Sequence, residues 1–281
     1  MLKYGFIKIL FLGALMGCLI ADPVFAGAWT REKGGWYHQV TGNYYTADEN
    51  FDDDGDTVDF VDNGVFRDKN AIYYLEYGIC DDLTANGSWS YKWLEYEDDV
   101  VVNKTDGFSD LELGLKYKLF SNGSGVCAIQ TMVKIPEDYD EEDAVPLGNG
   151  QYDYELRLLY GQSLFPHIPG YFNVEAGYRF RAEEPADEFK YLIEFGVDFT
   201  KKIYGRVKLD GTHGMDNADD TSYNLDNPTT TYNYDLGKLD VALGWKMLKE
   251  WGMELGCRPE IYGKNTAAGV NWSLSVIYQI P

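Results

Sequence analysis

The residues best suited to binding chemistry lie in one acidic stretch near the N-terminus. Carboxylates stand at or near alternate positions, with Gly55 at the bend; they belong to Asp52, Asp54, Asp56 and Asp59. Oxygen ligands at this spacing can surround a hard cation such as Ca²⁺. The closing glutamate and flanking helices of an EF-hand are missing. The sequence therefore predicts either a calcium site at these four aspartates or a solvated acidic loop.

Residues for catalysis at neutral pH are sparse. His38, His167 and His213 are the histidines of the chain, and histidine is the usual base near pH 7. None has the His-x-Ser spacing of the barrel phospholipase. Asp210 and His213 lie three positions apart, unlike the Asp-x-His pair of omptin-type proteases. Because no nucleophile, base and orienting residue converge, we expect no enzyme, no catalytic residues and no cofactor other than calcium.

Charge and aromatic content narrow the class of partner. The 281 residues contain 24 Lys and Arg against 46 Asp and Glu, a net charge of −22. A polyanion would be repelled by this balance, so we expect no nucleic acid partner. Aromatic residues make up 16% of the chain and 23 of them are tyrosine. Tyrosine and tryptophan favour strands and sites where an apolar region meets water.

The N-terminal segment has the pattern of an export signal. Two lysines precede an apolar run over residues 9–21, and Val24-Phe25-Ala26 provides a cleavage site. We expect residues 1–26 to be a signal peptide and residues 27–281 to form one mature domain. The alternative is lipoprotein processing at Cys18.

The mature chain alternates apolar and polar residues at period two. Leu111, Leu113 and Leu115, for example, enclose Glu112 and Gly114. This spacing predicts strands rather than helices. Twelve such segments have centres near Val40, Leu75, Trp89, Leu115, Thr131, Leu156, Ala176, Phe195, Val207, Val241, Leu255 and Leu274.

The lengths of the segments and of their connections indicate a membrane barrel. Several segments approach the ~9–11 residues that a tilted strand needs to cross a bilayer. Short turns alternate with long connections at 47–66, 97–107, 136–149, 181–188, 214–231 and 264–268. This pattern is typical of outer-membrane barrels with extracellular loops and periplasmic turns. We expect an all-β, antiparallel transmembrane barrel of about 12 strands (10–14) in the bacterial outer membrane, rather than a soluble sandwich or lipocalin-like barrel.

In this topology the acidic residues lie mainly in the outer loops, and the calcium prediction falls in the first extracellular loop. The inward positions, assigned by parity, are nearly neutral. The bases are Lys92, Lys116, Lys118, Lys134, Arg157, Arg179, Arg181, Lys190, Arg206, Lys208, Lys238, Lys246 and Arg258. The acids are Glu76, Asp110, Glu112, Asp153, Glu155, Glu175, Glu194, Asp198, Asp210, Asp240, Glu254 and Glu260. Such a lumen does not indicate an anion-selective pore; it is either a narrow polar passage or filled by ion pairs.

Three cysteines follow the expected signal peptide: Cys80, Cys127 and Cys257. They fall on the second, fifth and eleventh expected strands. Strands three apart lie ~14 Å from one another, beyond the ~7 Å reach of a disulfide. We expect three free, largely buried thiols.

Two short stretches carry a family resemblance. Gly27-Ala28-Trp29-Thr30 with Lys33–Tyr37, and Tyr44–Asp48 with Phe51–Gly55, resemble proteobacterial outer-membrane barrels of the "MetA-pathway of phenol degradation" transporter-like group. That group is distantly similar to FadL-type hydrocarbon channels. The resemblance implies passive uptake of small solutes, aromatic or apolar molecules among them, and it brings no site residues. Only residues 27–33 precede the first expected strand, where the FadL channels have a long plug.

Two functions therefore stand as hypotheses. The first is a passive, porin-like channel or transporter for small solutes. The second is a closed structural or surface-interaction barrel that conducts nothing. In either case we expect the partners to be outer-membrane lipid, lipopolysaccharide and the barrel-assembly machinery. The C-terminus, Tyr278-Gln279-Ile280-Pro281, keeps the alternation but ends in proline rather than in an aromatic residue.

Overall fold

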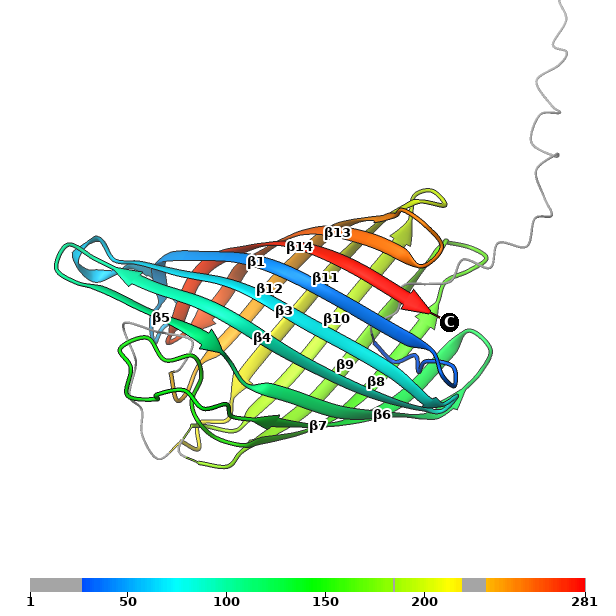
Figure 1. The fold of residues 1–281 in the computed structure, drawn as a ribbon, viewed down its shortest axis with the longest axis horizontal. Helices are drawn as coiled ribbons and strands as arrows, with labels where there is room; N and C mark the ends of the chain where they lie inside the picture. Colours follow the sequence, from blue (N-terminus) through cyan, green and yellow to red (C-terminus); the bar gives the residue numbers. More distant parts are fainter. Residues whose placement is uncertain (1–26, 184, 219–230, 281) are drawn as a thin grey trace, which may run out of the picture.

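The computed structural model describes residues 27–183, 185–218 and 231–280, and these form one closed antiparallel barrel of twelve strands (Figure 1). The barrel strands are β1 (Trp36–Phe51), β3 (Val65–Cys80), β4 (Leu83–Glu97), β6 (Leu111–Ser121), β7 (Gly125–Ile135), β8 (Asp153–Ser163), β9 (Gly170–Arg181), β10 (Glu188–Asp198), β11 (Ile203–Gly214), β12 (Asp235–Lys246), β13 (Trp251–Lys264) and β14 (Thr266–Ile280). Each of the twelve strand centres expected from the sequence lies in one of them, so the predicted fold is confirmed.

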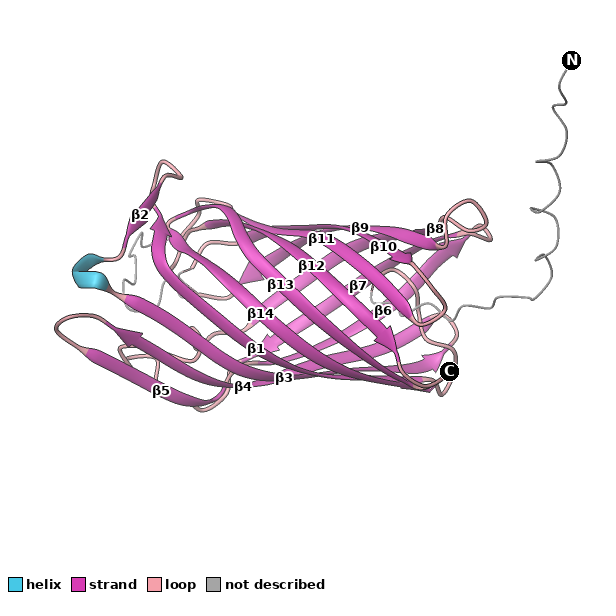
Figure 2. Cartoon of the chain, turned by 90° about the horizontal axis from the view of Figure 1, so that it is seen from above, coloured by secondary structure: helices cyan, strands magenta, loops and turns pink. Residues whose placement is uncertain are grey.

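The barrel closes where the first strand pairs with the last. Trp36 on β1 stands opposite Ile280 on β14, and the pairing continues up to Phe51 and Thr266. Strands therefore tilt around a closed wall without a free edge along the barrel (Figure 2). The first and last strands begin and end at the same rim as the short turns, which is the periplasmic rim of an outer-membrane barrel.

The period-two alternation separates an apolar outer surface from a polar lumen. On β8, Leu156 and Leu158 are 49% and 52% exposed, whereas Asp153 and Glu155 are buried. Exposed leucines of this kind recur around the wall, which places the barrel in a lipid bilayer. We conclude that the chain is an outer-membrane barrel, as its sequence predicts.

Aromatic side chains mark the periplasmic rim on the outer surface. The ring of His38 stacks on Trp36 at 5.4 Å, and His38 Nδ1 lies 2.7 Å from the Tyr73 hydroxyl oxygen. Trp251 and Tyr278 meet beside them, with ring centroids 4.7 Å apart. Amphipathic rings are favoured where the bilayer meets water, so this group is an interfacial girdle.

The outer connections contain more regular structure than the sequence suggested. The connection expected at 97–107 is mostly a hairpin, in which β5 (Val102–Phe108) pairs with the upper part of β4. The first loop contains β2 (Thr57–Asp59), paired with β1, and the short helix η1 (Val61–Asn63). The connection expected at 264–268 is the single residue Asn265. Among the described residues, no helix has the length and apolar character needed to cross a membrane.

Candidate solute passage

An ion-pair belt covers the inner wall from β6 to β10. It consists of Asp110, Glu112, Lys134, Asp153, Glu155, Arg157, Glu175, Arg179, Arg181, Glu188 and Lys190. Arg157, for example, lies 2.6 Å from Glu155 and 2.7 Å from Glu175. Each base contacts an acid on its own or a neighbouring strand, so the charges of the belt largely neutralise one another.

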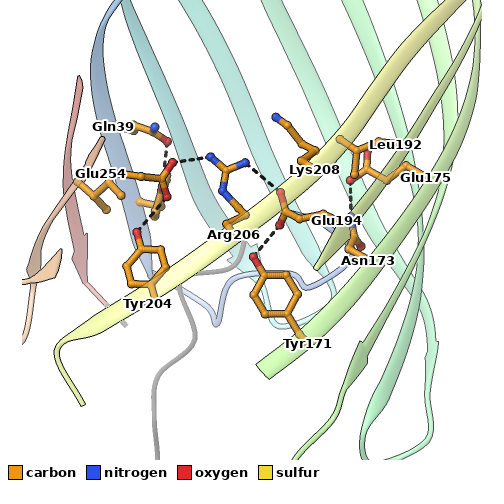
Figure 3. Close-up of a pocket in the computed structure, with 13 residues that line it drawn as sticks. Gln39, Tyr171, Asn173, Glu175, Leu192, Glu194, Tyr204, Arg206, Lys208 and Glu254 are labelled. Carbon is orange, nitrogen blue, oxygen red and sulfur yellow. Dashed lines mark hydrogen bonds and ion pairs between the residues drawn. The ribbon is translucent and has the colours of Figure 1, made fainter. Parts of the chain in front are cut away.

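A second group, the Arg206 cluster, lies on the adjacent wall (Figure 3). Arg206 on β11 contacts the carboxylates of Glu194, Asp240 and Glu254, and Lys208 lies 3.4 Å from Asp240. These residues come from four neighbouring strands, β10 to β13, and all face the lumen. The cluster therefore links the four strands to one another on the lumen side of the wall.

Two tyrosines add hydrogen bonds to the Arg206 cluster. Tyr171 donates to Glu194 at 2.6 Å, and Tyr204 donates to Glu254 at 3.1 Å. The ring of Tyr204 lies over Gly244, its partner across β11 and β12, where a Cβ atom would come within 1.9 Å of the ring. A glycine is therefore required beneath this ring, and it lets the tyrosine lie flat along the wall.

A cavity of about 190 Å³ remains between these groups in the periplasmic half of the lumen. Its lining includes Glu175 from the belt, Arg206 and Glu254 from the cluster, and Tyr37 from β1. Gly27 closes part of its boundary. The lining is polar and charged, so the space is suited to water and polar solutes.

The N-terminal segment (residues 27–35) enters the periplasmic end of the lumen. Arg31 Nε lies 2.6 Å from Glu76 Oε2, and Lys116 Nζ donates to the carbonyl oxygen of Gly27 at 2.7 Å. Ala28 is fully buried and its N–H donates to Asn173 at 3.2 Å. These contacts reach the inner wall from β3 to β9. No long plug is expected from the sequence, yet this short segment partly fills the lumen.

The third outer loop (residues 136–152) covers part of the extracellular mouth. Val145 and Leu147 are buried against Phe66, Leu94 and neighbouring apolar residues of the inner wall. The carbonyl oxygen of Leu147 accepts hydrogen bonds from Lys92 Nζ at 3.0 Å and Ser109 Oγ at 2.8 Å. The loop is thus folded inward and held at both an apolar and a polar contact.

Tyr139 fastens the same loop on its other side. Its hydroxyl donates to Asp110 and accepts from the N–H of Gly150 at 3.0 Å. Burial, together with the hydrogen bond to the Asp110 carboxylate, raises the pKa of Tyr139 well above its ordinary value. Tyr139 therefore stays protonated and remains a donor throughout the physiological range.

The four aspartates of the predicted calcium site lie in the turn between β1 and β2 and on β2 itself. Asp52 uses its carboxylate locally, accepting the N–H groups of Asp54 and Asp56 at 2.9 and 3.0 Å. Asp59 lies on β2, on the other side of the turn. Within the described ranges, no three acidic, histidine or cysteine side chains converge on a common metal position. Calcium binding here stays a prediction, which calorimetry with Ca²⁺ would test.

The cysteines are free, as predicted, but not all are buried. Cys127 is 8% exposed and Cys257 is partly exposed, whereas Cys80 is exposed. The expectation for Cys80 is wrong because Cys80 is the last residue of β3, at the periplasmic rim, and lies beyond a register shift that follows Gly78.

The histidines lie on different elements. His213 Nδ1 lies 2.7 Å from Asp235 Oδ1, its partner across β11 and β12, and not beside Asp210. His167 lies in the turn before β9, and His38 belongs to the outer girdle.

The predicted polar lumen is confirmed in large part. Ion pairs form at ten of the thirteen bases expected to face inward, the exceptions being Lys92, Lys238 and Arg258. The parity count missed Asp68 and Glu188, which belong to the same inner face, and Arg31, which arrives from outside the strands. Glu188 stands at the first position of β10, where the boundary of a strand is hardest to place from sequence.

No protein-family model and no curated protein matches the sequence. The COG4313 outer membrane channel from Pseudomonas putida F1 is similar with a TM-score of 0.72 and 13% identity, over 90% of this chain and 98% of that chain. The NanC porin has a TM-score of 0.56 and 7% identity, over 86% and 100%. A TodX deltaS2S3 mutant monoaromatic hydrocarbon channel has a TM-score of 0.50 and 9% identity, over 89% and 91%. At these identities the likeness establishes a shared barrel fold.

Proposed function

We propose that this protein is a passive channel for small solutes across the outer membrane. The observation that carries the proposal is the polar cavity between the ion-pair belt and the Arg206 cluster. Such a space can hold water and a polar solute inside the wall, which a passage across the membrane requires. The similar folds named channels and porins support the same function.

The finer proposal is that the solutes include aromatic or apolar molecules. The resemblance of the N-terminal stretches to the phenol-degradation transporter-like group supports it, as does the barrel similarity to a monoaromatic hydrocarbon channel. An apolar contact lies at the extracellular mouth, where Val145 and Leu147 of the loop pack on Phe66 and Leu94 of the wall. A solute of this kind could take the place of the two loop side chains.

A closed structural barrel is the second candidate, and one specific observation favours it. Both ends of the lumen carry inward-folded chain, the N-terminal segment at the periplasmic end and residues 136–152 at the extracellular mouth. If both remain in place, they narrow the lumen at each of its ends.

Single-channel recording from the refolded mature chain, residues 27–281, separates the two functions. A channel gives discrete current steps in a planar bilayer, whereas a closed barrel gives none. Correct folding is checked first by heat-modifiable migration in detergent gels. Silence from a preparation that is folded by this criterion would contradict the channel for ions and polar solutes. Uptake of radiolabelled toluene into liposomes that contain the protein then tests the apolar route, which carries no current.

A further inference from the structure

Two cations on the inner wall of the extracellular half have no acidic partner in contact. Lys238 lies on β12 and Arg258 on β13, at positions that face the lumen. Within the described part of the chain, neither side chain has an ion pair or hydrogen bond, in contrast to the ammonium group of Lys208 one strand away. The cross-strand partner of Lys238 is Glu260, two positions along β13 from Arg258, so the two cations are diagonal neighbours on the same face of the wall.

Two of the three nearby carboxylates, those of Glu260 and Asp68, accept hydrogen bonds from other donors. Glu260 is the partner of Lys238 across β12 and β13, but its Oε2 accepts from the Tyr45 hydroxyl at 2.7 Å and from the N–H of Gly269 at 2.9 Å. Asp68 accepts from Asn70 at 2.8 Å. Asp210 stands opposite Lys238 in the β11–β12 register without approaching to ion-pair distance.

The lack of an ion pair distinguishes Lys238 and Arg258 from the cations of the ion-pair belt and of the Arg206 cluster. A guanidinium group offers five N–H donors and an ammonium group three. Charged donors inside a protein are tolerated where water or a ligand reaches them. The total charge of the lumen does not reveal this difference. The charges of the ion-pair belt and the Arg206 cluster pair among themselves, whereas the donors of Lys238 and Arg258 stay available to a ligand.

We propose that Lys238 and Arg258 bind the carboxylate group of a small organic solute within the lumen. An arginine fork matches a carboxylate through two parallel hydrogen bonds, and the adjacent ammonium adds a third donor of the same sign. Asn271, the partner of Arg258 across β13 and β14, is bonded to Asn43, so an amide row lies beside the bound group. The proposal rests on the proposed channel function and names the class of solute that the channel takes.

Calorimetry on the folded barrel in detergent tests the site without requiring conduction. The probes are sodium benzoate and sodium gluconate, with benzyl alcohol and glucose as their uncharged counterparts. Saturable binding of at least one carboxylate, with no binding of its neutral counterpart, is the expected result. Which carboxylate binds better tells whether the rest of the solute is aromatic or hydroxylated. Equal behaviour of the charged and neutral probes would overturn the proposal.

Substitutions at the site and beside it should change the affinity for the carboxylate in opposite directions. The double variant Lys238→Gln/Arg258→Gln removes the charged donors and weakens carboxylate binding at least ~10-fold. Asp210→Asn removes a competing anion and strengthens binding several-fold. Lys69→Gln removes a charge of the same sign from the outer side of β3, where Lys69 lies near the Tyr44 ring, and leaves binding unchanged. Heat-modifiable migration confirms folding of each variant. Unchanged affinity in the folded double variant would also overturn the site.

The same preparations in a planar bilayer separate this inference from the channel function. Carboxylate binding by a barrel that never conducts would leave the site in place and contradict the channel. Conduction without carboxylate binding would contradict the site and leave the channel in place. Where both hold, benzoate or gluconate interrupts the current of the wild-type protein and not that of the double variant.

Discussion

Arg31 fastens the N-terminal segment to the barrel through Glu76, with Nε and Oε2 2.6 Å apart. Glu76 is 1% exposed, and its other carboxylate oxygen lies 3.1 Å from Lys116 Nζ. One buried acid thus holds two cations, one from the wall and one from a segment outside the strands. The contact couples the position of the N-terminal segment to the interior of the barrel.

Replacing this acid should release the segment. Glu76→Gln removes the carboxylate that Arg31 and Lys116 share, and loss of one partner from a buried ion pair costs about 3 kcal/mol or more. We expect faster amide hydrogen exchange over residues 27–31 and a lower free energy of unfolding in urea. Where the barrel conducts, its current steps should also increase.

A matched variant on the outer side provides the control. Glu95 contacts Arg67 and Lys104 on the projecting strands and is partly exposed, so Glu95→Gln should cost ~1 kcal/mol or less. Its exchange over residues 27–31 should match the wild type. Unchanged exchange in Glu76→Gln would mean that the other contacts of the segment, such as that of Ala28 with Asn173, are sufficient to hold it.

The cost of placing an arginine on the lipid-facing wall should depend on its depth in the bilayer. Leu158 lies near the middle of β8 on the outer surface and is 52% exposed. Leu158→Arg should destabilise the barrel by ~2–4 kcal/mol in a bilayer, whereas Phe180→Arg, at the extracellular end of β9, should cost ~0–1 kcal/mol. Equilibrium unfolding from liposomes measures both. Similar costs for the two variants would contradict the assigned membrane position.

The strands could be predicted because their signal is local. Alternation along β8 fixes which residues face lipid whatever the neighbouring strand is, and the same holds for β14. The inner face followed from the same parity, so most bases of the lumen were assigned correctly. The partners of those bases could not be assigned, because they depend on side-chain geometry: Arg206 contacts Glu194, Asp240 and Glu254 together, on three other strands.

Contacts between segments that are distant in the sequence could not be predicted from the period-two alternation. Residues 27–35 have no period of their own, and their place in the lumen depends on Glu76, Lys116 and Asn173 on three separate strands. The inward fold of Leu147 likewise depends on Lys92 and Ser109. The unpaired state of Lys238 and Arg258 follows only when the other donors around Glu260 are known.

The connection between β9 and β10 carries a pH-dependent contact at Asp187. Partial burial would raise the pKa of Asp187, but the N–H of Arg181, the amide of Asn217 and the hydroxyl of Tyr178 donate to its carboxylate and hold its pKa below the ordinary value. With a lower pKa in the folded protein than in the unfolded chain, the contact stabilises the fold above pH ~4. That contribution is lost as the pH falls through the folded pKa.

Asp187→Asn should therefore lower the thermal midpoint at pH 7, and the difference from the wild type should shrink as the pH falls below ~4. The heat-modifiable shift in gel mobility measures the midpoint at each pH. Asp143→Asn, at an exposed position of the loop 136–152, serves as control and should show no difference at any pH. A difference for Asp187→Asn that persists unchanged to pH 2 would rule out titration of this carboxylate as its cause.

The exposed thiol of Cys80 offers a direct test of orientation. Cys80 ends β3 at the rim of the short turns, which we assign to the periplasm. A membrane-impermeant maleimide should leave it unlabelled in intact cells and label it once the outer membrane is permeabilised, while buried Cys127 stays unreactive in both. Val100, 77% exposed at the tip of the β4–β5 hairpin, marks the opposite end. In a Cys80→Ser background, Val100→Cys should react in intact cells. The reverse labelling pattern would contradict the assigned orientation. It would place the acidic loops and the loop 136–152 in the periplasm and the N-terminal segment at the cell surface.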